Sequence, residues 1–565
     1  MHREEKGDSK AYGFKSNYAI HDGSYGVWQK GKEDVPYFVP KGNAVYVSKI
    51  IKRIDTGEIY LKLYFYNNLG EKIEREFARR NLTEQGILDL IAYGVNVLKS
   101  DSKILIATIM QQESESPCEL RHEKLGFTYY NKKRVFLAKK AINVSSKYLG
   151  KYKIGRTGQY SVWKQMVEKE VLGHIPLEFM LSVGGSAVIT DFLRDTVQVE
   201  NVLVSLVSDS SKGKSTAGLL MVSCGAMPSL TGDSFAFILA DTINAIMASI
   251  PSGYPTLLDE ASLIRYNPTS LLYNLSMGKE KQRLTKELEK ANGSYFSTAI
   301  AITSERGVLS SADENSGLLV RVLEIANVTW TKSAQSADSI KSITHQNYGW
   351  LVPKLAKYLL TSISEEEVVS EYWKWHEWLV QLAEYKGAYN NFTERACKQY
   401  ALIMLSAELI QEVMGIELHL DDIGEFILEH SPVGENGQVN IGERALHYLM
   451  QYIVKHYSYF ISPDDKDYVP TKCYGKIVRK EKKLLNGIVS KERLLVTEDT
   501  LKMILTEGRF PEMNVVLKHW KESGFLQCEK DRRASTVCIL PGKPTKGYII
   551  CLPYVESDSE IDNIE

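Results

Sequence analysis

The segment 208–216, Ser-Asp-Ser-Ser-Lys-Gly-Lys-Ser-Thr, contains the residues of this chain that are best suited to bind phosphate. It follows the apolar run 202–207, which predicts a buried parallel strand, and it precedes the helix-forming segment 217–223. In such a strand–loop–helix, loop N–H groups and the helix N-terminus converge on an anion. The expected nucleotide-binding residues are Ser208, Ser211, Lys212, Gly213, Lys214, Ser215 and Thr216.

Two residues of this loop have specific expected roles. Lys214 is expected to reach the β- and γ-phosphates of ATP, and the Ser215 hydroxyl is expected to hold Mg²⁺. The usual motif begins with glycine, where this chain has Ser208. Because serine tolerates a positive φ poorly, the substitution predicts an unusual backbone shape at the loop entry. The alternative interpretation is a Ser/Lys-rich surface loop without a ligand.

An acidic pair follows the apolar segment 254–258, which predicts a second strand. Asp259 lies 45 residues after Lys214 and is expected to hold Mg²⁺, while Glu260 would polarise the attacking water. A strand that ends in an acidic residue is common by itself. Together with the phosphate loop, however, the pair predicts ATP hydrolysis.

A third strand, predicted over 298–302, ends in the polar residues Thr303 and Ser304. A hydroxyl at this position can contact the γ-phosphate and the attacking water; Ser304 is the first candidate and Thr303 the second. The alternative is an ordinary polar strand end.

Arg321 stands at the start of the next apolar strand, in the segment 317–324. An arginine at a subunit boundary can stabilise the charge of the transition state of phosphoryl transfer as an arginine finger. The alternative is a local ion pair with Glu324 or Asp313.

Two basic segments are candidates for DNA binding. The first, 277–286, lies where an inserted hairpin would enter the central channel of a ring, although its glutamates also fit a solvated helix face. The second belongs to 497–553, where the order helix, helix, β-hairpin predicts a winged helix that binds duplex DNA or another protein. The expected phosphate contacts are Lys279, Lys281, Arg283, Lys286, Arg532, Arg533 and Lys543.

The composition sets the context for these sites. The chain has 565 residues, a formal net charge of −1 and 44% hydrophobic residues, so any nucleic-acid site must be a local patch. Its seven cysteines include no Cys-x-x-Cys pair, which predicts reduced thiols and a cytoplasmic location. We expect no signal peptide and no membrane span, because the apolar segment 235–250 is too short to cross a bilayer.

In their order, these motifs resemble the MCM-like AAA+ helicases of mobile genetic elements. The residues that carry the resemblance are the phosphate loop, 240–245, 257–260, Gly278-Lys279, 303–305, Gly317 and 320–321. The resemblance implies a homohexameric ring that hydrolyses ATP with Mg²⁺ and moves 3′→5′ on single-stranded DNA. It places Lys214, Ser215, Asp259, Glu260 and Ser304 in one subunit and Arg321 in its neighbour, with Arg395 as a second sensor arginine from a helical lid.

The predicted architecture is a multidomain α/β protein. Its parts are a β-rich N-terminal domain (1–120), a linking region (121–195), an AAA+ P-loop ATPase core (196–330), a helical lid (331–485), a winged helix (486–555) and an acidic tail (556–565). Within the N-terminal domain, 1–40 is expected to be weakly ordered or edge structure, and 43–78 an antiparallel meander.

Several functions fit the sequence. The leading one is a helicase that replicates a mobile element, with single-stranded DNA, duplex DNA and an element-encoded primase or polymerase as candidate partners. The alternatives are an AAA+ initiator or helicase loader, an ATP-gated antiphage switch and, least favoured, a small-molecule P-loop kinase. Glu260 argues against a pure switch, because a switch needs no hydrolytic base.

Overall fold

The computed structural model describes most of the chain. The described residues are 17–31, 34–239, 243–264, 266–279, 295–312, 316–431, 441–464, 470–483, 489–508, 510, 513–528 and 534–553. They divide into two compact units, one made of 1–155 with 356–362 and the other of 156–355 with 363–565. Among the expected DNA contacts and segments, those outside the described residues are Lys281, Arg283, Lys286, Arg532, Arg533, residues 240–242 of the motif series and the tail 556–565.

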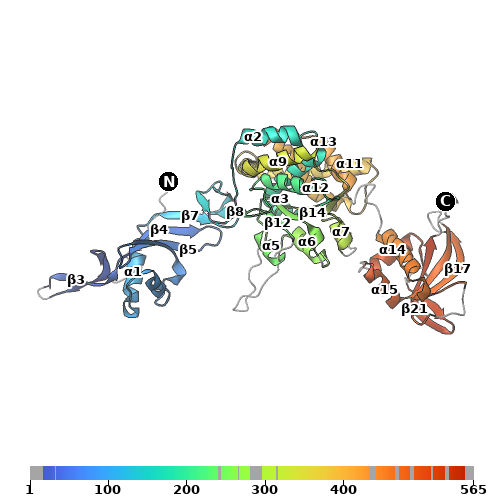
Figure 1. Ribbon diagram of the computed structural model, residues 1–565, viewed down its shortest axis with the longest axis horizontal. Helices are drawn as coiled ribbons and strands as arrows, with labels where there is room; N and C mark the ends of the chain where they lie inside the picture. The colour runs from blue at the N-terminus through green and yellow to red at the C-terminus, as the bar shows by residue number, and fades with distance from the viewer. Residues whose placement is uncertain are drawn as a thin grey trace. The chain divides into compact units, whose positions relative to one another are not determined.

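The N-terminal unit is built mainly from antiparallel strands, whose sequence alternates apolar and polar residues with a period of two, while β7 pairs in parallel with β4 and β10. Strands β4, β5 and β6 form the expected meander, and they share a five-stranded sheet of order β10-β7-β4-β5-β6 (Figure 1). Buried Val45, Leu61, Leu63 and Phe65 form the centre of its core.

Two expectations for this unit concern its start and its end. Residues 18–43, expected to be weakly ordered or edge structure, form a three-stranded antiparallel sheet, β1-β2-β3. The expected boundary at 120 falls inside β7, which pairs with β4 and β10. The elements are β1 (Tyr18–His21), β2 (Ser24–Lys30), β3 (Pro36–Asn43), β4 (Val45–Arg53), β5 (Ile59–Tyr66), β6 (Lys72–Ala78), η3 (Arg79–Asn81), η4 (Gly86–Tyr93), η5 (Lys99–Asp101), α1 (Ser102–Glu113), β7 (Cys118–His122), β8 (Gly126–Tyr130), β9 (Lys133–Leu137) and β10 (Ser146–Tyr148).

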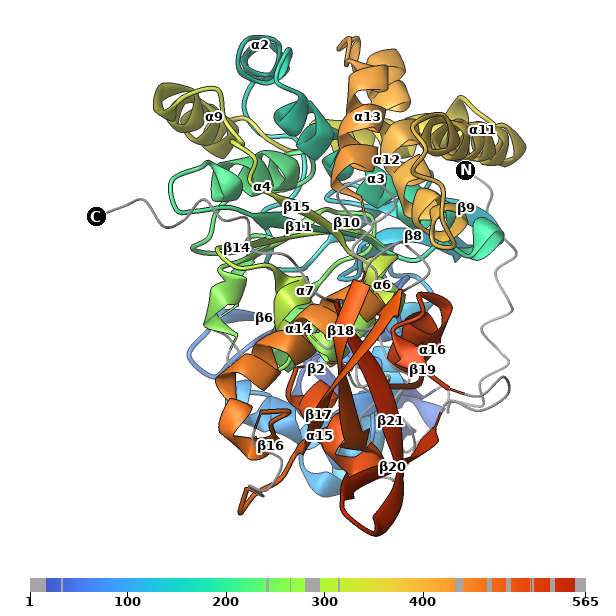
Figure 2. The same ribbon diagram turned by 90° about the vertical axis from the view of Figure 1, so that its right-hand side faces the viewer.

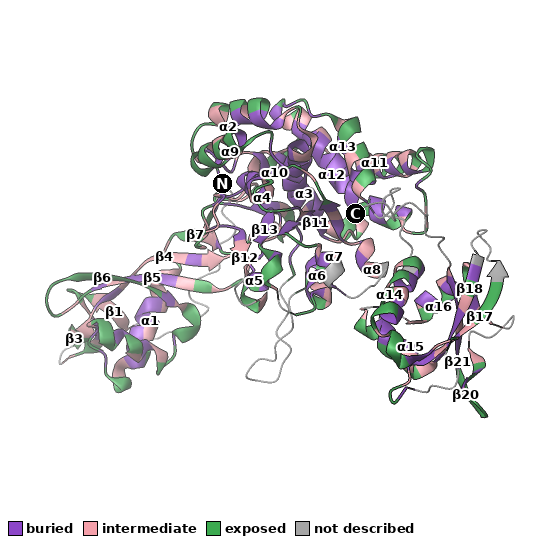
Figure 3. Ribbon diagram, turned by 45° about the vertical axis from the view of Figure 1, so that its right-hand side comes forward, coloured by how far each residue is buried: buried purple, intermediate pink, exposed green. Residues whose placement is uncertain are grey.

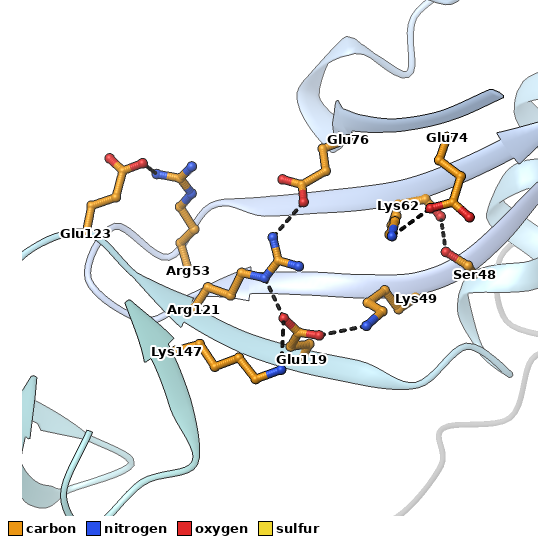
Figure 4. Close-up of polar contacts among 10 residues, drawn as sticks. All are labelled: Ser48, Lys49, Arg53, Lys62, Glu74, Glu76, Glu119, Arg121, Glu123 and Lys147. Atoms are coloured by element: carbon orange, nitrogen blue, oxygen red, sulfur yellow. Dashed lines mark hydrogen bonds and ion pairs between the residues drawn. The ribbon is translucent and has the colours of Figure 1, made fainter. Parts of the chain in front are cut away.

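Paired charges cover part of this sheet (Figure 4). The Glu119 carboxylate accepts hydrogen bonds from Lys49 Nζ at 2.7 Å and Arg121 Nε at 2.5 Å, and Arg121 also donates to Glu76. The hydrogen bonds from Lys49 and Arg121 lower the pKa of Glu119 to about 2. Both cations are therefore neutralised within the sheet.

Replacing Glu119 by glutamine is expected to loosen the junction of β4 and β7. The native carboxylate has a pKa below its unfolded value, so its stabilisation is present above about pH 4.3 and is lost as the pH falls toward 2. At pH 7 the loss of this half-buried carboxylate should cost about 1–3 kcal/mol of local stability. Hydrogen exchange of β4 and β7 in the full chain measures the effect. Equal exchange in E119Q and wild type at pH 7 would contradict it.

The second unit contains a five-stranded sheet of order β12-β13-β14-β11-β15, whose pairings are all parallel. Its strands are short apolar runs, as a sheet covered on both faces requires, and the three central strands, β13, β14 and β11, are almost wholly buried (Figure 3). In Figure 2, α3, α4 and α12 lie over one face, and α6 and α7 lie over the other. The alternation of strands and helices expected for 196–330 is therefore present.

The central helix of this unit is α3 (Ile175–Val197). A side chain at Gly184 would place a Cβ 2.6 Å from Cys224 Sγ, so glycine allows the close packing of α3 on the end of α4. By length and composition α3 is apolar enough to cross a membrane, but 83% of its apolar window is buried inside the protein. We therefore interpret α3 as the core helix of this unit.

The strands and helices of this part follow in chain order. They are α2 (Tyr160–Met166), η6 (Val167–Val171), α3, β11 (Val202–Val207), α4 (Lys214–Ser223), β12 (Ala236–Ile238), α5 (Ile243–Ser249), β13 (Thr256–Asp259), η7 (Ala261–Leu263), α6 (Thr269–Met277), β14 (Ala299–Ser304), α7 (Val308–Ser311), α8 (Ser316–Leu319), β15 (Leu323–Ala326), α9 (Ala334–Gln346), α10 (Leu351–Thr361), α11 (Glu365–Tyr385), α12 (Thr393–Met414) and α13 (Leu420–His430).

The C-terminal part begins earlier than the expected boundary at 486. Helix α14 packs its buried Leu446 and Leu449 into the same core as Trp520 of α16 and Ile550 of β21. The expected boundary falls between two paired strands, β17 and β18, so residues up to 485 are only partly helical. The elements are α14 (Ile441–Lys455), η9 (Tyr457–Tyr459), β16 (Phe460–Ile461), β17 (Gly475–Lys483), β18 (Val489–Thr497), α15 (Glu498–Glu507), α16 (Met513–Glu522), β19 (Leu526–Gln527), β20 (Ser535–Leu540) and β21 (Lys543–Pro553).

Candidate functional site

The loop 208–213 joins the end of β11 to the start of α4, which begins at Lys214. Gly213 has a φ of 86°, and a Cβ at this position would lie 2.7 Å from Thr331 Oγ1, so both the backbone conformation and the space require glycine. The other residue of the loop with a positive φ is Ser211, at 65°. Ser208 does not have a positive φ. The unusual loop entry predicted from Ser208 is therefore wrong, because this position makes no demand that only glycine meets.

Lys214 folds over the loop that precedes it. Its Nζ donates hydrogen bonds to the carbonyl oxygens of Ser208 and, at 2.8 Å, Asp209. The loop is also tied to the segment after β15, because Trp330 N–H donates to the Lys212 carbonyl at 2.8 Å. These contacts hold an ammonium group at the N-terminus of α4, where backbone N–H groups also favour an anion.

Asp259 is the last residue of β13, and its carboxylate accepts hydrogen bonds from two hydroxyl groups. Its Oδ1 accepts hydrogen bonds from Ser215 Oγ at 3.0 Å and Thr303 Oγ1 at 2.6 Å, and the residue is only 3% exposed. Within the described residues, its Oδ2 has no hydrogen bond, and no cluster of three His, Cys, Asp or Glu side chains forms a protein-only metal cage. One carboxylate beside one hydroxyl fits Mg²⁺, which keeps waters and phosphate oxygens as further ligands.

Glu260 adopts an uncommon backbone conformation directly after this strand. Its φ is 62°, in the left-handed region, and its N–H donates to Thr303 Oγ1 at 3.1 Å. The same Thr303 hydroxyl donates to Asp259, so one side chain positions both acidic residues. Strained backbone of this kind clusters at functional sites. Its effect here is to turn an exposed carboxylate toward the space beside the phosphate loop.

That space is a cavity of about 220 Å³. Residues 210–216 form one side of it, and Glu260 and 303–305 form the other. Ser304, the first candidate of the third strand, lines the cavity and accepts the Arg306 N–H at 3.3 Å. The structure thus brings together the residues expected to act within one subunit at the C-terminal edge of the parallel sheet.

The two candidate arginines do not line this cavity. Both form ion pairs with Glu200. Arg321 Nη2 donates to Glu200 Oε1 at 3.0 Å, Nε lies 3.0 Å from Oε2, and Nη1 donates to the Gly317 carbonyl at 2.8 Å. Arg395, on α12, approaches Glu200 Oε1 at 3.7 Å. The local partner is thus not Glu324, whose carboxylate accepts from Ser205 Oγ and the Leu309 N–H and whose pKa is raised by burial.

Glu200 precedes β11, whereas the phosphate loop follows it. Six strand residues at about 3.3 Å each separate the two sheet edges by about 20 Å. Arg321 and Arg395 therefore lie well beyond the reach of their own subunit's phosphate loop. Arg321 and Arg395 can therefore either stabilise the fold at this edge or contact another molecule there.

Lys279 lies at the same edge as these arginines. It forms an isolated antiparallel bridge with Tyr295, so the chain departs and returns at neighbouring positions around 280–294. Asn201, beside Glu200, donates to the Leu275 carbonyl of α6 at 2.7 Å. In the C-terminal part, Lys543 is exposed at the start of β21.

Two residues of the site were underrated or missed by sequence reasoning. Thr303 was the second candidate at its position, yet its hydroxyl bonds connect Asp259 and Glu260. Lys341, on α9, lines the phosphate-loop cavity and carries no sequence signal, because a lone lysine on a helix is ordinarily a solvated residue.

A parallel sheet with a strand–loop–helix at its C-terminal edge, followed by a C-terminal helix-helix-hairpin unit, defines a multidomain α/β protein. Residues 440–554 match the family model described as Cch helix turn helix domain, and residues 24–293 match the model described as Domain of unknown function (DUF927). No curated protein matches the chain.

Several solved structures match the chain, and one of them is titled "SCCmec type IV Cch - active helicase". The likeness covers 96% of this chain and 98% of that chain, with a TM-score of 0.72 and 23% sequence identity. The likeness shows that the two proteins share a fold, and it confirms at that level the resemblance indicated by the order of the motifs. The match at 440–554 also agrees with the start of the C-terminal core at α14.

Proposed function

We propose that this protein is an ATP-dependent DNA helicase of a mobile genetic element, built on an AAA+ P-loop core with a helical lid. The observation that carries the proposal is the position of the candidate residues at two opposite edges of one sheet. The phosphate loop and the Asp259-Glu260 pair lie at the carboxyl edge, while Arg321 and Arg395 lie at the other. The fold shared with a protein titled an active helicase, and the helix-turn-helix match, support the same function.

Each side chain of the site has its own proposed role in ATP hydrolysis. The loop N–H groups and Lys214 bind the phosphates of ATP, while Ser215 and Asp259 hold Mg²⁺, which neutralises phosphate charge when bound. Glu260 orients the attacking water and takes up its proton. Thr303 holds both acidic residues in place, and Ser304 contacts the γ-phosphate.

In a ring of subunits, the sheet edge that carries Arg321 and Arg395 could contact a neighbouring subunit. If each subunit places its Glu200 edge against the phosphate loop of the next, Arg321 completes the neighbour's site, and a head-to-tail interface of this kind closes into a homohexamer. Arg395 belongs to the same edge and so, in this proposal, also acts on the neighbour.

DNA is the proposed substrate of the ring. Single-stranded DNA would pass the segment that follows Lys279, in the 3′→5′ direction, and duplex DNA would contact the helix-turn-helix domain near Lys543. An element-encoded primase or polymerase is the proposed protein partner, and the cytoplasm the proposed location.

A strand-displacement assay tests the function. The full-length protein is incubated with forked, 3′-tailed and 5′-tailed duplexes, and DNA-stimulated ATP hydrolysis is measured in parallel. We expect unwinding of the forked and 3′-tailed duplexes. An ATPase-active oligomer that unwinds no duplex would exclude the helicase and favour an initiator or loader. A protein that binds ATP and hydrolyses it at the same slow rate with and without DNA would favour a switch.

Thr303→Val should slow ATP turnover about 10- to 100-fold. Valine keeps the shape of the side chain but removes the donor to Asp259 Oδ1 and the acceptor for the Glu260 N–H. Thr303→Ser retains the hydroxyl and serves as the matched control. Steady-state ATPase kinetics separate the outcomes, and equal kcat values for T303V and T303S would show that the hydroxyl has no positioning role.

A further inference from the structure

A second cavity adjoins the phosphate-loop cavity. It has a volume of about 500 Å³, within the range of small-ligand pockets, and it is bounded by α4, 228–231 and 341–346 of α9. Ser215 and Lys341 line both cavities. The two spaces therefore meet at the start of the helix that follows the phosphate loop, with a lysine at their junction.

The fold holds Lys341 at this junction. Helix α9 is capped by Ser333, whose Oγ accepts the Ser336 N–H at 3.1 Å. It is anchored by buried Ile340 and by Thr344, whose Oγ1 donates to the Ile340 carbonyl at 2.7 Å. Lys341, between these two buried residues, is exposed. The backbone of α9 is thus held in place, while the exposed Lys341 side chain lines both cavities.

The charges around Lys341 indicate the kind of ligand. Lys214 already binds two loop carbonyls, and Glu305 accepts a hydrogen bond from Ser210. The Lys341 ammonium group, by contrast, has no hydrogen-bond or ion-pair partner in the part of the chain that the structure describes. An unpaired ammonium group beside a phosphate loop is suited to an anionic phosphate oxygen.

We propose that a nucleoside triphosphate spans the two cavities, with Lys341 of α9 binding its phosphates at their junction and the larger cavity receiving its nucleoside. This inference rests on the proposed nucleotide-dependent function. It adds a phosphate-binding side chain that belongs to helix α9 and not to the strands or loops of the sheet edge. Leu219 and Leu230 supply the apolar surface that a base requires, and Gln346 supplies polar groups.

Equilibrium binding of a fluorescent ATP analogue, with inorganic tripolyphosphate as a competitor, tests the proposal in the full-length protein. Lys341→Ala should weaken binding of ATP and of tripolyphosphate by about 10- to 100-fold, and Lys341→Arg should restore much of it. Lys398→Ala removes an exposed lysine of α12 that lines neither cavity, and it should change nothing. Leu230→Trp fills the larger cavity, so it should weaken ATP but leave tripolyphosphate binding intact.

Each outcome has a distinct meaning. Failure of the wild-type protein to bind ATP would overturn the proposed function itself. Wild-type binding with no loss in K341A would overturn the role of Lys341 alone, and full ATP affinity in L230W would remove the nucleoside from the larger cavity. A lower thermal midpoint of K341A without ligand would reveal a structural role instead, and an unchanged midpoint is expected because the side chain is exposed and unpaired.

Discussion

Glu260→Gln is expected to leave ATP binding intact and to reduce turnover by at least about 100-fold. Glutamine is nearly isosteric, and the backbone N–H of residue 260 can still donate to Thr303, so the left-handed conformation is retained. What is lost is the carboxylate that takes up the proton of the attacking water. Single-turnover hydrolysis and equilibrium ATP binding measure the two properties separately.

Glu305→Gln is the matched control for this experiment. Glu305 lines the same cavity and accepts a hydrogen bond from Ser210, but it has no contact with Asp259 or Thr303 among the residues described. We expect E305Q to retain most of the activity. If E305Q lost turnover while E260Q kept it, the base would have been assigned to the wrong carboxylate.

Arg321→Ala is expected to reduce ATP turnover by about 1,000-fold or more, the usual effect of losing an arginine finger. The expected loss is that of a neighbour's site, because the guanidinium lies about 20 Å from its own phosphate loop. Mixing R321A with Lys214→Ala subunits separates the two sites. Rings with both variants should regain some activity at interfaces where an intact loop meets an intact arginine. A mixture that is no more active than either variant alone would argue against a role in trans.

Glu200→Gln distinguishes catalysis from structure at the same place. This variant weakens the ion pairs with Arg321 and Arg395 but keeps both arginines. If Arg321 acts on a neighbour, E200Q should retain much more activity than R321A. If the arginine serves only to hold α12 and the start of β15 together, the two variants should lower the thermal midpoint alike and affect turnover alike.

The strand–loop–helix around Lys214 was predictable because its signals are local. The apolar run 202–207 became β11, and Gly213 occupies a conformation and a space that only glycine fits. The unusual loop entry predicted from the average motif was wrong, because Ser208 does not have a positive φ. The expected domain limits at 120 and 486 also missed, because β7 pairs with β4, and β17 with β18, across them. Strand pairing between distant segments leaves no local signal.

The sequence alone indicated the chemistry to expect of this protein, since the residue types and their order predict a phosphate loop, an acidic pair and a polar third strand. The tertiary structure decided where each residue can act. Parallel pairing of β11, β13 and β14 brings Ser215, Asp259 and Thr303 within hydrogen-bonding distance, and packing of α12 near Glu200 moves Arg395 to the opposite edge. Only the fold could reveal Lys341, because its closeness to the phosphate loop depends on how α9 packs on α4.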